Sequence, residues 1–121
     1  MLLLSCLLAF SCKRHSEKGI EFAIANRSGK PVAAVEVSAQ IPEAAVYFDA
    51  IDADQLVTGF LSMEANTGDG SYTLRFTRSG KPEENLNAGY FTNGGPLDRR
   101  IEFEIQMDTV VVTYRSLLYV P

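Results

Sequence analysis

Three aspartates stand close together in the segment FDAIDAD, and a fourth follows in the loop NTGDGS. Asp49, Asp52 and Asp54 form the first group, with Glu43 nearby, and Asp69 is the fourth. Loop carboxylates are the ligands that Ca²⁺ takes, in sets of roughly six to eight oxygens. The spacing lacks the alternate ligands and the terminal glutamate of an EF-hand. The four aspartates are therefore a candidate calcium site, and solvated turns are the alternative.

Other catalytic chemistry has little support in the sequence. The one histidine, His15, lies in a polar charged segment, and no G-x-S-x-G motif is present. Gly68-Asp69-Gly70 lacks the lysine of a phosphate-binding loop and has the composition of a turn. Two carboxylates for glycoside hydrolysis can be chosen from fifteen acids, but the chain has no tryptophan to stack on a sugar. We expect no enzymatic activity.

Two adjacent aromatic residues, Tyr90 and Phe91, precede the segment Asn93-Gly94-Gly95. Because neighbouring residues of a strand face opposite sides, both rings cannot enter one core. One of the two is therefore expected at the surface, and Tyr90 and Phe91 form the candidate binding surface.

The start of the chain carries signals for export. The apolar run Leu2–Phe10 has the length of a signal-peptide hydrophobic segment, about half of the ~20 residues that span a bilayer. Ser11, Cys12 and the charged stretch Lys13–Lys18 follow directly. This arrangement resembles a bacterial lipoprotein signal peptide with its lipobox, although Ala9 stands where the lipobox usually has leucine.

The resemblance implies that residues 1–11 are removed and that Cys12 carries the lipid anchor, which several acyl chains make stable. Cys6 is a weaker match, because cleavage there would leave the rest of the apolar run in the mature chain. A disulfide is the alternative use of two cysteines in an exported protein, but Cys6 lies in the segment to be removed. Lys13 in place of an aspartate favours sorting to the outer membrane. The usual basic start of a signal peptide is absent, which leaves open a start upstream of Met1.

The composition excludes several classes of protein. The chain has 121 residues, enough for one domain, and its 46% hydrophobic residues are typical of a folded protein. Eleven basic and fifteen acidic side chains give a net charge of −4, which disfavours binding to nucleic acid. We expect residues 12–18 to form a lipidated cysteine with a charged tether and residues 19–121 to form one domain.

Alternation of apolar and polar residues with a period of two recurs along this domain and predicts β-strands. The expected strands lie at 20–25, 31–40, 45–50, 56–63, 71–78, 86–92, 101–106 and 109–115, and residues 116–121 extend or follow the last one. Asn93-Gly94-Gly95 predicts a hairpin turn, because Asn and Gly accept positive φ. The residues that form the apolar faces of the clearest strands are Ile20, Phe22, Ile24, Val35, Val37, Ala39, Tyr72, Leu74, Phe76, Ile101, Phe103 and Ile105.

Seven or eight short strands predict an all-β fold, an antiparallel immunoglobulin-like β-sandwich, with a small β-barrel as the alternative. The chain resembles small lipoproteins of Gram-negative bacteria whose mature part is a single β-sandwich; the signal, the size and the pattern DGSYTLRF followed by GYFTNG carry this resemblance. It implies no catalytic residues.

We therefore expect a non-catalytic, lipid-anchored protein of the bacterial cell envelope. Its expected partners are the membrane, through the lipid anchor, and a protein or envelope component that binds to loops or to an exposed sheet edge. A calcium-dependent carbohydrate-binding or adhesion module is the alternative. No cofactor besides the candidate calcium is expected.

Overall fold

The computed structural model of the chain describes residues 18–116, and every regular element within them is a β-strand. The strands are β1 (Gly19–Asn26), β2 (Val32–Ser38), β3 (Ala45–Ile51), β4 (Leu56–Ser62), β5 (Gly70–Arg78), β6 (Glu83–Thr92), β7 (Gly95–Pro96), β8 (Asp98–Ile105) and β9 (Val110–Ser116). The predicted all-β fold is confirmed. There are nine strands rather than seven or eight, because the short β7 adds to those predicted.

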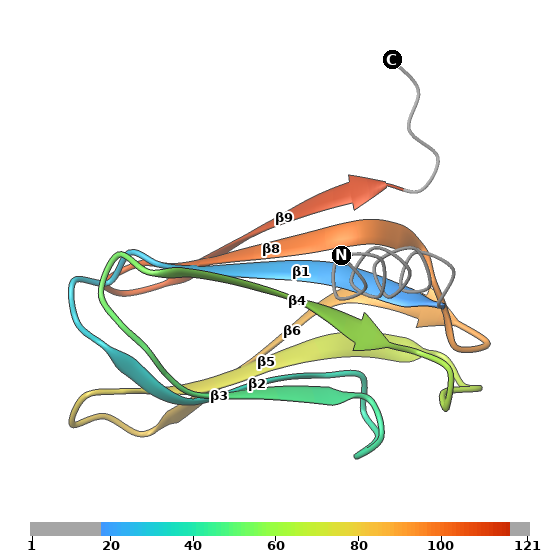
Figure 1. Ribbon diagram of the computed structural model, residues 1–121, viewed down its shortest axis with the longest axis horizontal. Helices are drawn as coiled ribbons and strands as arrows, with labels where there is room; N and C mark the ends of the chain where they lie inside the picture. Colours follow the sequence, from blue (N-terminus) through green and yellow to red (C-terminus); the bar gives the residue numbers. More distant parts are fainter. Residues whose placement is uncertain (1–17, 117–121) are drawn as a thin grey trace, which may run out of the picture.

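The strands form two sheets that lie face to face as a β-sandwich (Figure 1). The four-stranded sheet has the order β4-β1-β8-β9, and the five-stranded sheet has the order β3-β2-β5-β6-β7. All neighbouring strands are antiparallel except β1 and β8, which run parallel. The predicted immunoglobulin-like sandwich is thus confirmed as an architecture of two mostly antiparallel sheets.

The core lies between the two sheets and contains every residue that the alternation placed on an apolar strand face. Each of these side chains is at most 2% exposed. One aromatic contact crosses the interior, where the rings of Phe22 and Phe48 meet edge to face at 6.2 Å. The rings of Tyr72 and Phe91, on neighbouring strands of the five-stranded sheet, lie 5.4 Å apart. The alternation of apolar and polar residues predicted these core residues correctly, because each strand has one face toward the core and one toward solvent.

The predicted turn at Asn93-Gly94-Gly95 is also confirmed. Thr92 pairs with Gly95, so Asn93 and Gly94 form a two-residue turn, and both have positive φ, 50° and 71°. This is the geometry that matches the twist of a hairpin. A Cβ atom at Gly94 would also overlap the Asn66 carbonyl oxygen, so the turn needs glycine for two reasons.

Strand β2 contains an irregularity that the alternation did not predict. Val32 and Val35 are both buried although they are three residues apart, and the pairing with β5 shifts between Ala33 and Glu36. Between them, Ala34 has a φ of 51°, in the left-handed region. A β-bulge at this position restores the alternation for the rest of the strand.

We expect Ala34→Gly to raise the free energy of unfolding by about 1 kcal/mol, because alanine is strained at positive φ and glycine is not. Urea denaturation measures the change. Ala33→Gly is the matched control, since Ala33 is also exposed but is not among the residues with positive φ. We expect this control to lower the free energy by ~0.5–1 kcal/mol. Effects of the same sign in the two variants would contradict the assignment of strain to Ala34.

Candidate functional site

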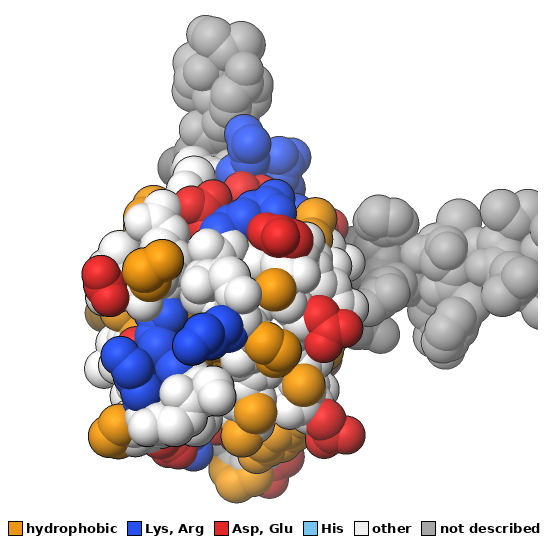
Figure 2. All heavy atoms as spheres, turned by 90° about the vertical axis from the view of Figure 1, so that its left-hand side faces the viewer, with side chains coloured by type: hydrophobic (Ala, Val, Ile, Leu, Met, Phe, Trp, Pro, Cys, Tyr) orange, Lys and Arg blue, Asp and Glu red, His pale blue; other side chains and the backbone are white. Residues whose placement is uncertain are grey.

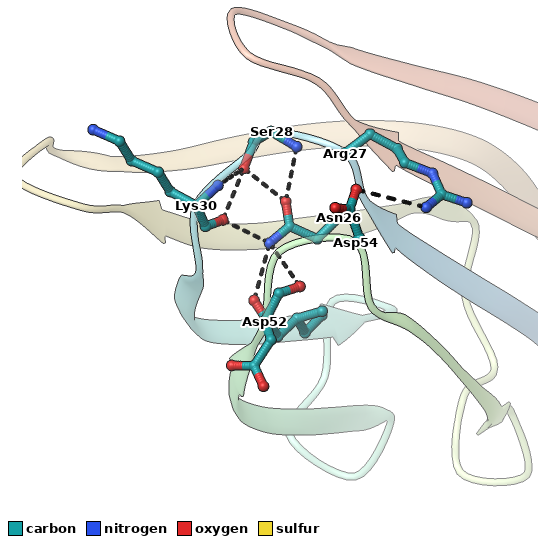
Figure 3. A network of polar contacts seen from close by, with 7 residues as sticks. Asn26, Arg27, Ser28, Lys30, Asp52 and Asp54 are labelled. Atoms are coloured by element: carbon teal, nitrogen blue, oxygen red, sulfur yellow. Dashed lines mark hydrogen bonds and ion pairs between the residues drawn. The ribbon is translucent and has the colours of Figure 1, made fainter.

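Asp52 and Asp54 lie in the connection between β3 and β4, against the end of β1. The Asp54 backbone N–H donates to the Asn26 carbonyl at 2.8 Å, and its carboxylate lies 3.9 Å from the Arg27 guanidinium. Asp52 contributes its backbone carbonyl, which accepts a hydrogen bond from the Asn26 amide at 3.2 Å. Figure 3 shows that the two carboxylates do not converge.

The other two predicted metal ligands lie elsewhere. Asp69 is at the opposite end of the sandwich, where its Oδ1 accepts a hydrogen bond of 2.8 Å from the Asn93 backbone N–H. The same loop accepts a hydrogen bond from Lys18, directly before β1, so the length of β1 separates Asp69 from Asp52. Asp49 is exposed on β3. Within residues 18–116, no three His, Cys, Asp or Glu residues gather closely enough to hold a metal ion.

Figure 2 shows the end of the sandwich that carries Asp52 and Asp54. Acidic side chains are spread around its rim, and Lys and Arg side chains gather left of its centre and at its top. Arg27 and Lys30, in the β1–β2 turn, and Lys81, in the β5–β6 turn, belong to this end. The arrangement lacks the convergent oxygen ligands of a calcium site.

Asn26 ties this end of the sandwich together and is fully buried. Its Nδ2 donates to the carbonyl oxygens of Lys30, Ile51 and Asp52, at 2.8, 3.0 and 3.2 Å. Its Oδ1 accepts from the backbone N–H and the hydroxyl of Ser28, at 3.1 and 2.7 Å (Figure 3). One side chain thus links the end of β1 to the β1–β2 turn and to the end of β3 in the other sheet.

Of the predicted surface pair, Tyr90 lies at the surface and Phe91 lies in the core. Phe91 is only 1% exposed and packs against Tyr72, so its assignment to a binding surface was wrong. Tyr90 is 47% exposed. A bulge in β6 at Gly89 and Tyr90, where Gly89 has a φ of 73°, sets which ring enters the core.

Tyr72 is the one residue of the described part with a buried side-chain polar atom that has no hydrogen-bond partner. Burial, and then the charge of Asp98, raise the pKa of its hydroxyl. Burial also raises the pKa of the Asp98 carboxyl, at the start of β8. The Tyr72 hydroxyl is closed off from solvent and stays protonated at neutral pH, so it offers no acid–base chemistry to a surface ligand.

The exposed face of the five-stranded sheet carries a transverse row of paired side chains. Tyr47, Glu36, Arg75 and Asn85 lie opposite one another on β3, β2, β5 and β6. Arg75 is 3.2 Å from the Glu36 carboxylate and donates to the Asn85 carbonyl at 3.0 Å. A hydrogen bond to Glu36 raises the pKa of the Tyr47 hydroxyl. These polar side chains thus form hydrogen bonds and an ion pair with one another.

Strand β9 forms an outer edge of the four-stranded sheet, with β8 as its one neighbour in that sheet. It begins with Val110-Val111-Val112-Thr113-Tyr114, and Val111 and Tyr114 are 45% and 46% exposed. Val110 and Val112 are half-buried against the core. The strand is therefore apolar on its inner face and partly apolar on its outer face.

Alternate backbone groups of β9 point away from the sheet. The Gln106 N–H donates to the Thr109 carbonyl at 2.8 Å, so these two residues form the first hydrogen-bonded pair of the β8–β9 hairpin. Hydrogen-bonded and non-hydrogen-bonded pairs alternate along an antiparallel ladder. Val111 and Thr113 therefore bond to β8, and Val110, Val112 and Tyr114 direct their N–H and C=O groups outward.

The other edges of the described sheets are interrupted. β3 carries Asp49, β4 contains Gly59 and β7 contains Pro96, which has no N–H donor. β7 covers β6 only at Phe91 and Thr92, and the rest of the outer side of β6 carries Glu83, Glu84 and Gly89. Charges, glycine and proline are features that discourage the addition of another strand. β9 has none of them between Val110 and Tyr114, and its one charged residue, Arg115, lies near the end of the strand.

Sequence reasoning predicted β9 but not its place at an edge. Its run of β-branched residues predicts a strand but does not distinguish an edge strand from a central one. Of the predicted surface residues, Tyr90 alone is exposed. The predicted signal peptide and Cys12 lie outside the described residues, which contain no helix long and apolar enough to cross a membrane.

No family model matches the chain. No curated protein sequence is significantly similar to it. Among solved structures, an NMR structure of a protein from Eubacterium rectale is similar, with a TM-score of 0.49 and 12% sequence identity over 84% of this chain and 94% of that chain. A similarity at this level supports no functional inference.

Proposed function

We propose that this chain is a non-catalytic, lipid-anchored protein of the bacterial cell envelope that binds another protein through the exposed edge of its β-sandwich. The observation that carries the binding role is β9, which presents outward-facing backbone groups at Val110, Val112 and Tyr114 next to exposed apolar side chains. An extended segment of a partner can add to such an edge by main-chain hydrogen bonds.

The anchoring role is supported by the sequence around Cys12. The segment Lys13–Lys18 joins this cysteine to the start of β1 at Gly19. At ~3.3–3.6 Å per residue, it spans about 20 Å when extended. This length lets the sandwich lie near a lipid surface without inserting into it, and its basic residues are suited to anionic headgroups.

Replacement of Cys12 tests the anchor. We expect Cys12→Ser to abolish incorporation of radiolabelled palmitate and to move the protein from the membrane pellet to the soluble fraction, because the thiol that carries the lipid is absent. Cys6→Ser is the matched control, since Cys6 lies within the predicted signal peptide, and we expect it to leave both readouts unchanged. Labelling and membrane association that persist in Cys12→Ser would overturn the lipid-anchor proposal.

A further inference from the structure

The apolar edge strand β9 is complementary to a second copy of itself. We propose that two copies of this chain pair through antiparallel β9 strands, with the two-fold axis at Val112, so that the two four-stranded sheets join into one sheet. This inference names the partner at the binding edge and therefore rests on that part of the proposed function.

Backbone geometry limits the register of this pairing. Val110, Val112 and Tyr114 direct backbone groups outward, so a hydrogen-bonded pair of these strands joins two residues of this set. The register centred on Val112 uses all three. With Val112 opposite Val112 of the second copy, Val110 lies opposite Tyr114 at both ends of the pair. Three such pairs exchange about six backbone hydrogen bonds.

Side chains are compatible in the same register. On the inner face, Val112 meets its own copy and Val110 meets Tyr114, and on the outer face Val111 meets Thr113. Pairs of β-branched and aromatic residues across neighbouring strands are stabilising. The shared surface thus extends the apolar row that Val110 and Val112 already form against the core.

Charge also favours this arrangement. The one charged residue of β9 is Arg115, which lies opposite Thr109 of the second copy, next to Asp108 in the β8–β9 turn. No like charges are placed opposite each other along the strand. In this register Arg115 has an acidic residue, Asp108, close to it in the sequence of the opposite strand and has no basic residue opposite it.

The symmetry has a consequence for membrane attachment. Because the axis crosses β9, the two β1 strands run in opposite directions, and Gly19 of each copy lies at opposite ends of the pair. Two anchors in one membrane therefore require the strands to lie along the membrane surface. The ~20 Å that Lys13–Lys18 can span reaches the lipid from either end.

Disulfide trapping in intact cells tests the pairing with the full, lipidated chain. The axis places the Cα atoms of residue 112 about 5.5 Å apart in a hydrogen-bonded pair, within the ~4.4–6.8 Å range for a disulfide. We expect Val112→Cys, oxidised with copper phenanthroline, to give a band of twice the monomer mass on non-reducing gels. Thr58→Cys is the control, since Thr58 is more exposed and lies on β4, the other edge of the same sheet.

Charge changes at Thr109 test the register. In the Val112→Cys background, Thr109→Lys places a positive charge opposite Arg115, and Thr109→Glu places a negative one there. We expect the first to lower the trapped dimer at least about threefold and the second to raise it. Lack of a dimer in Val112→Cys, or equal trapping in Thr58→Cys, would overturn self-pairing. An adduct of another mass at residue 112 would also overturn it, but would leave the proposed binding function intact.

Discussion

Replacing Asn26 with alanine is expected to lower the free energy of unfolding by ~3 kcal/mol, because buried polar groups that lose their partners each cost about 1–3 kcal/mol. The Asn26 side chain donates to three carbonyl oxygens and accepts from two donors of Ser28. These partners belong to three different strands and turns. In a domain of this size, this loss corresponds to a fall in Tm of at least ~10 °C. Thermal and urea denaturation followed by circular dichroism measure both quantities.

A second variant separates hydrogen bonding from packing at this position. Asn26→Asp keeps the shape of the side chain but replaces the Nδ2 donor with an oxygen that faces the carbonyls of Lys30, Ile51 and Asp52. At neutral pH, we expect a loss at least as large as in Asn26→Ala, because an acceptor then faces acceptors.

Asn87→Ala is the matched control for Asn26. Asn87 is exposed on β6 and makes one side-chain hydrogen bond, with the Thr73 hydroxyl at 2.9 Å. We expect a change within ~0.5 kcal/mol, as is usual for surface positions. If Asn26→Ala and Asn87→Ala had equal effects, the buried network would not be what holds this end of the sandwich.

Strand alternation predicted the core, and the reason lies in the geometry of a two-layer fold. Tyr72, Leu74 and Phe76 share one face of β5 in the sequence pattern and are fully buried in the structure. The same pattern continues to Arg78, so a charged residue falls on the core face. The alternation along β5 therefore indicated that Arg78 is buried, but it could not show which groups Arg78 binds.

The order of strands within each sheet could not be predicted in the same way. A strand with one apolar face looks alike at the centre and at the edge of a sheet, so β9 gave no sign that its outer backbone groups face away from its neighbour. The alternation pattern also failed to predict the bulge at Ala34. Ala33 and Ala34 are identical small residues, so the sequence does not show at which of them the strand changes the face that it turns to the core.

The four predicted calcium ligands do not come together in the structure. Asp52 and Asp54 remain neighbours, but their side chains diverge because the β3–β4 connection uses its backbone groups to bind Asn26. Asp69 belongs to a turn, where its carboxylate accepts from the Asn93 N–H. The alternative in which these aspartates are turn residues describes their contacts in the structure.

Arg78→Met is expected to lower the free energy of unfolding by ~2–4 kcal/mol, since it breaks a buried, charge-assisted network. The Arg78 side chain crosses from β5 to the other sheet and donates to the Gln106 carbonyl at 2.6 Å and the Thr109 carbonyl at 3.3 Å. Its Nε donates to the Glu84 carboxylate at 2.6 Å, and its guanidinium carbon lies 5.2 Å from the centre of the Phe76 ring. Methionine keeps the apolar stem and removes every donor.

Arg78→Lys asks whether the charge or the planar donor group matters. We expect lysine to restore less than half of the loss, because a single ammonium group cannot reach acceptors that a guanidinium binds on two sides. Hydrogen exchange should locate the defect. The backbone amides of residues 106–110 should exchange faster in both variants, and by a larger factor than the amides of β1.

Arg27→Met is the matched control for Arg78, since Arg27 is an exposed arginine whose ion pair with Asp54 is 3.9 Å long. Exposed pairs of this kind contribute at most ~1 kcal/mol. We expect Arg27→Met to leave both stability and exchange in residues 106–110 nearly unchanged. Full stability in Arg78→Lys would show that a positive charge suffices, and would contradict the view that the two sheets are joined at this end by a bidentate arginine. If only the Arg78 variants lose much of the free energy of unfolding, the β8–β9 turn depends on this one side chain from the opposite sheet. The start of the edge strand β9 then depends on it as well.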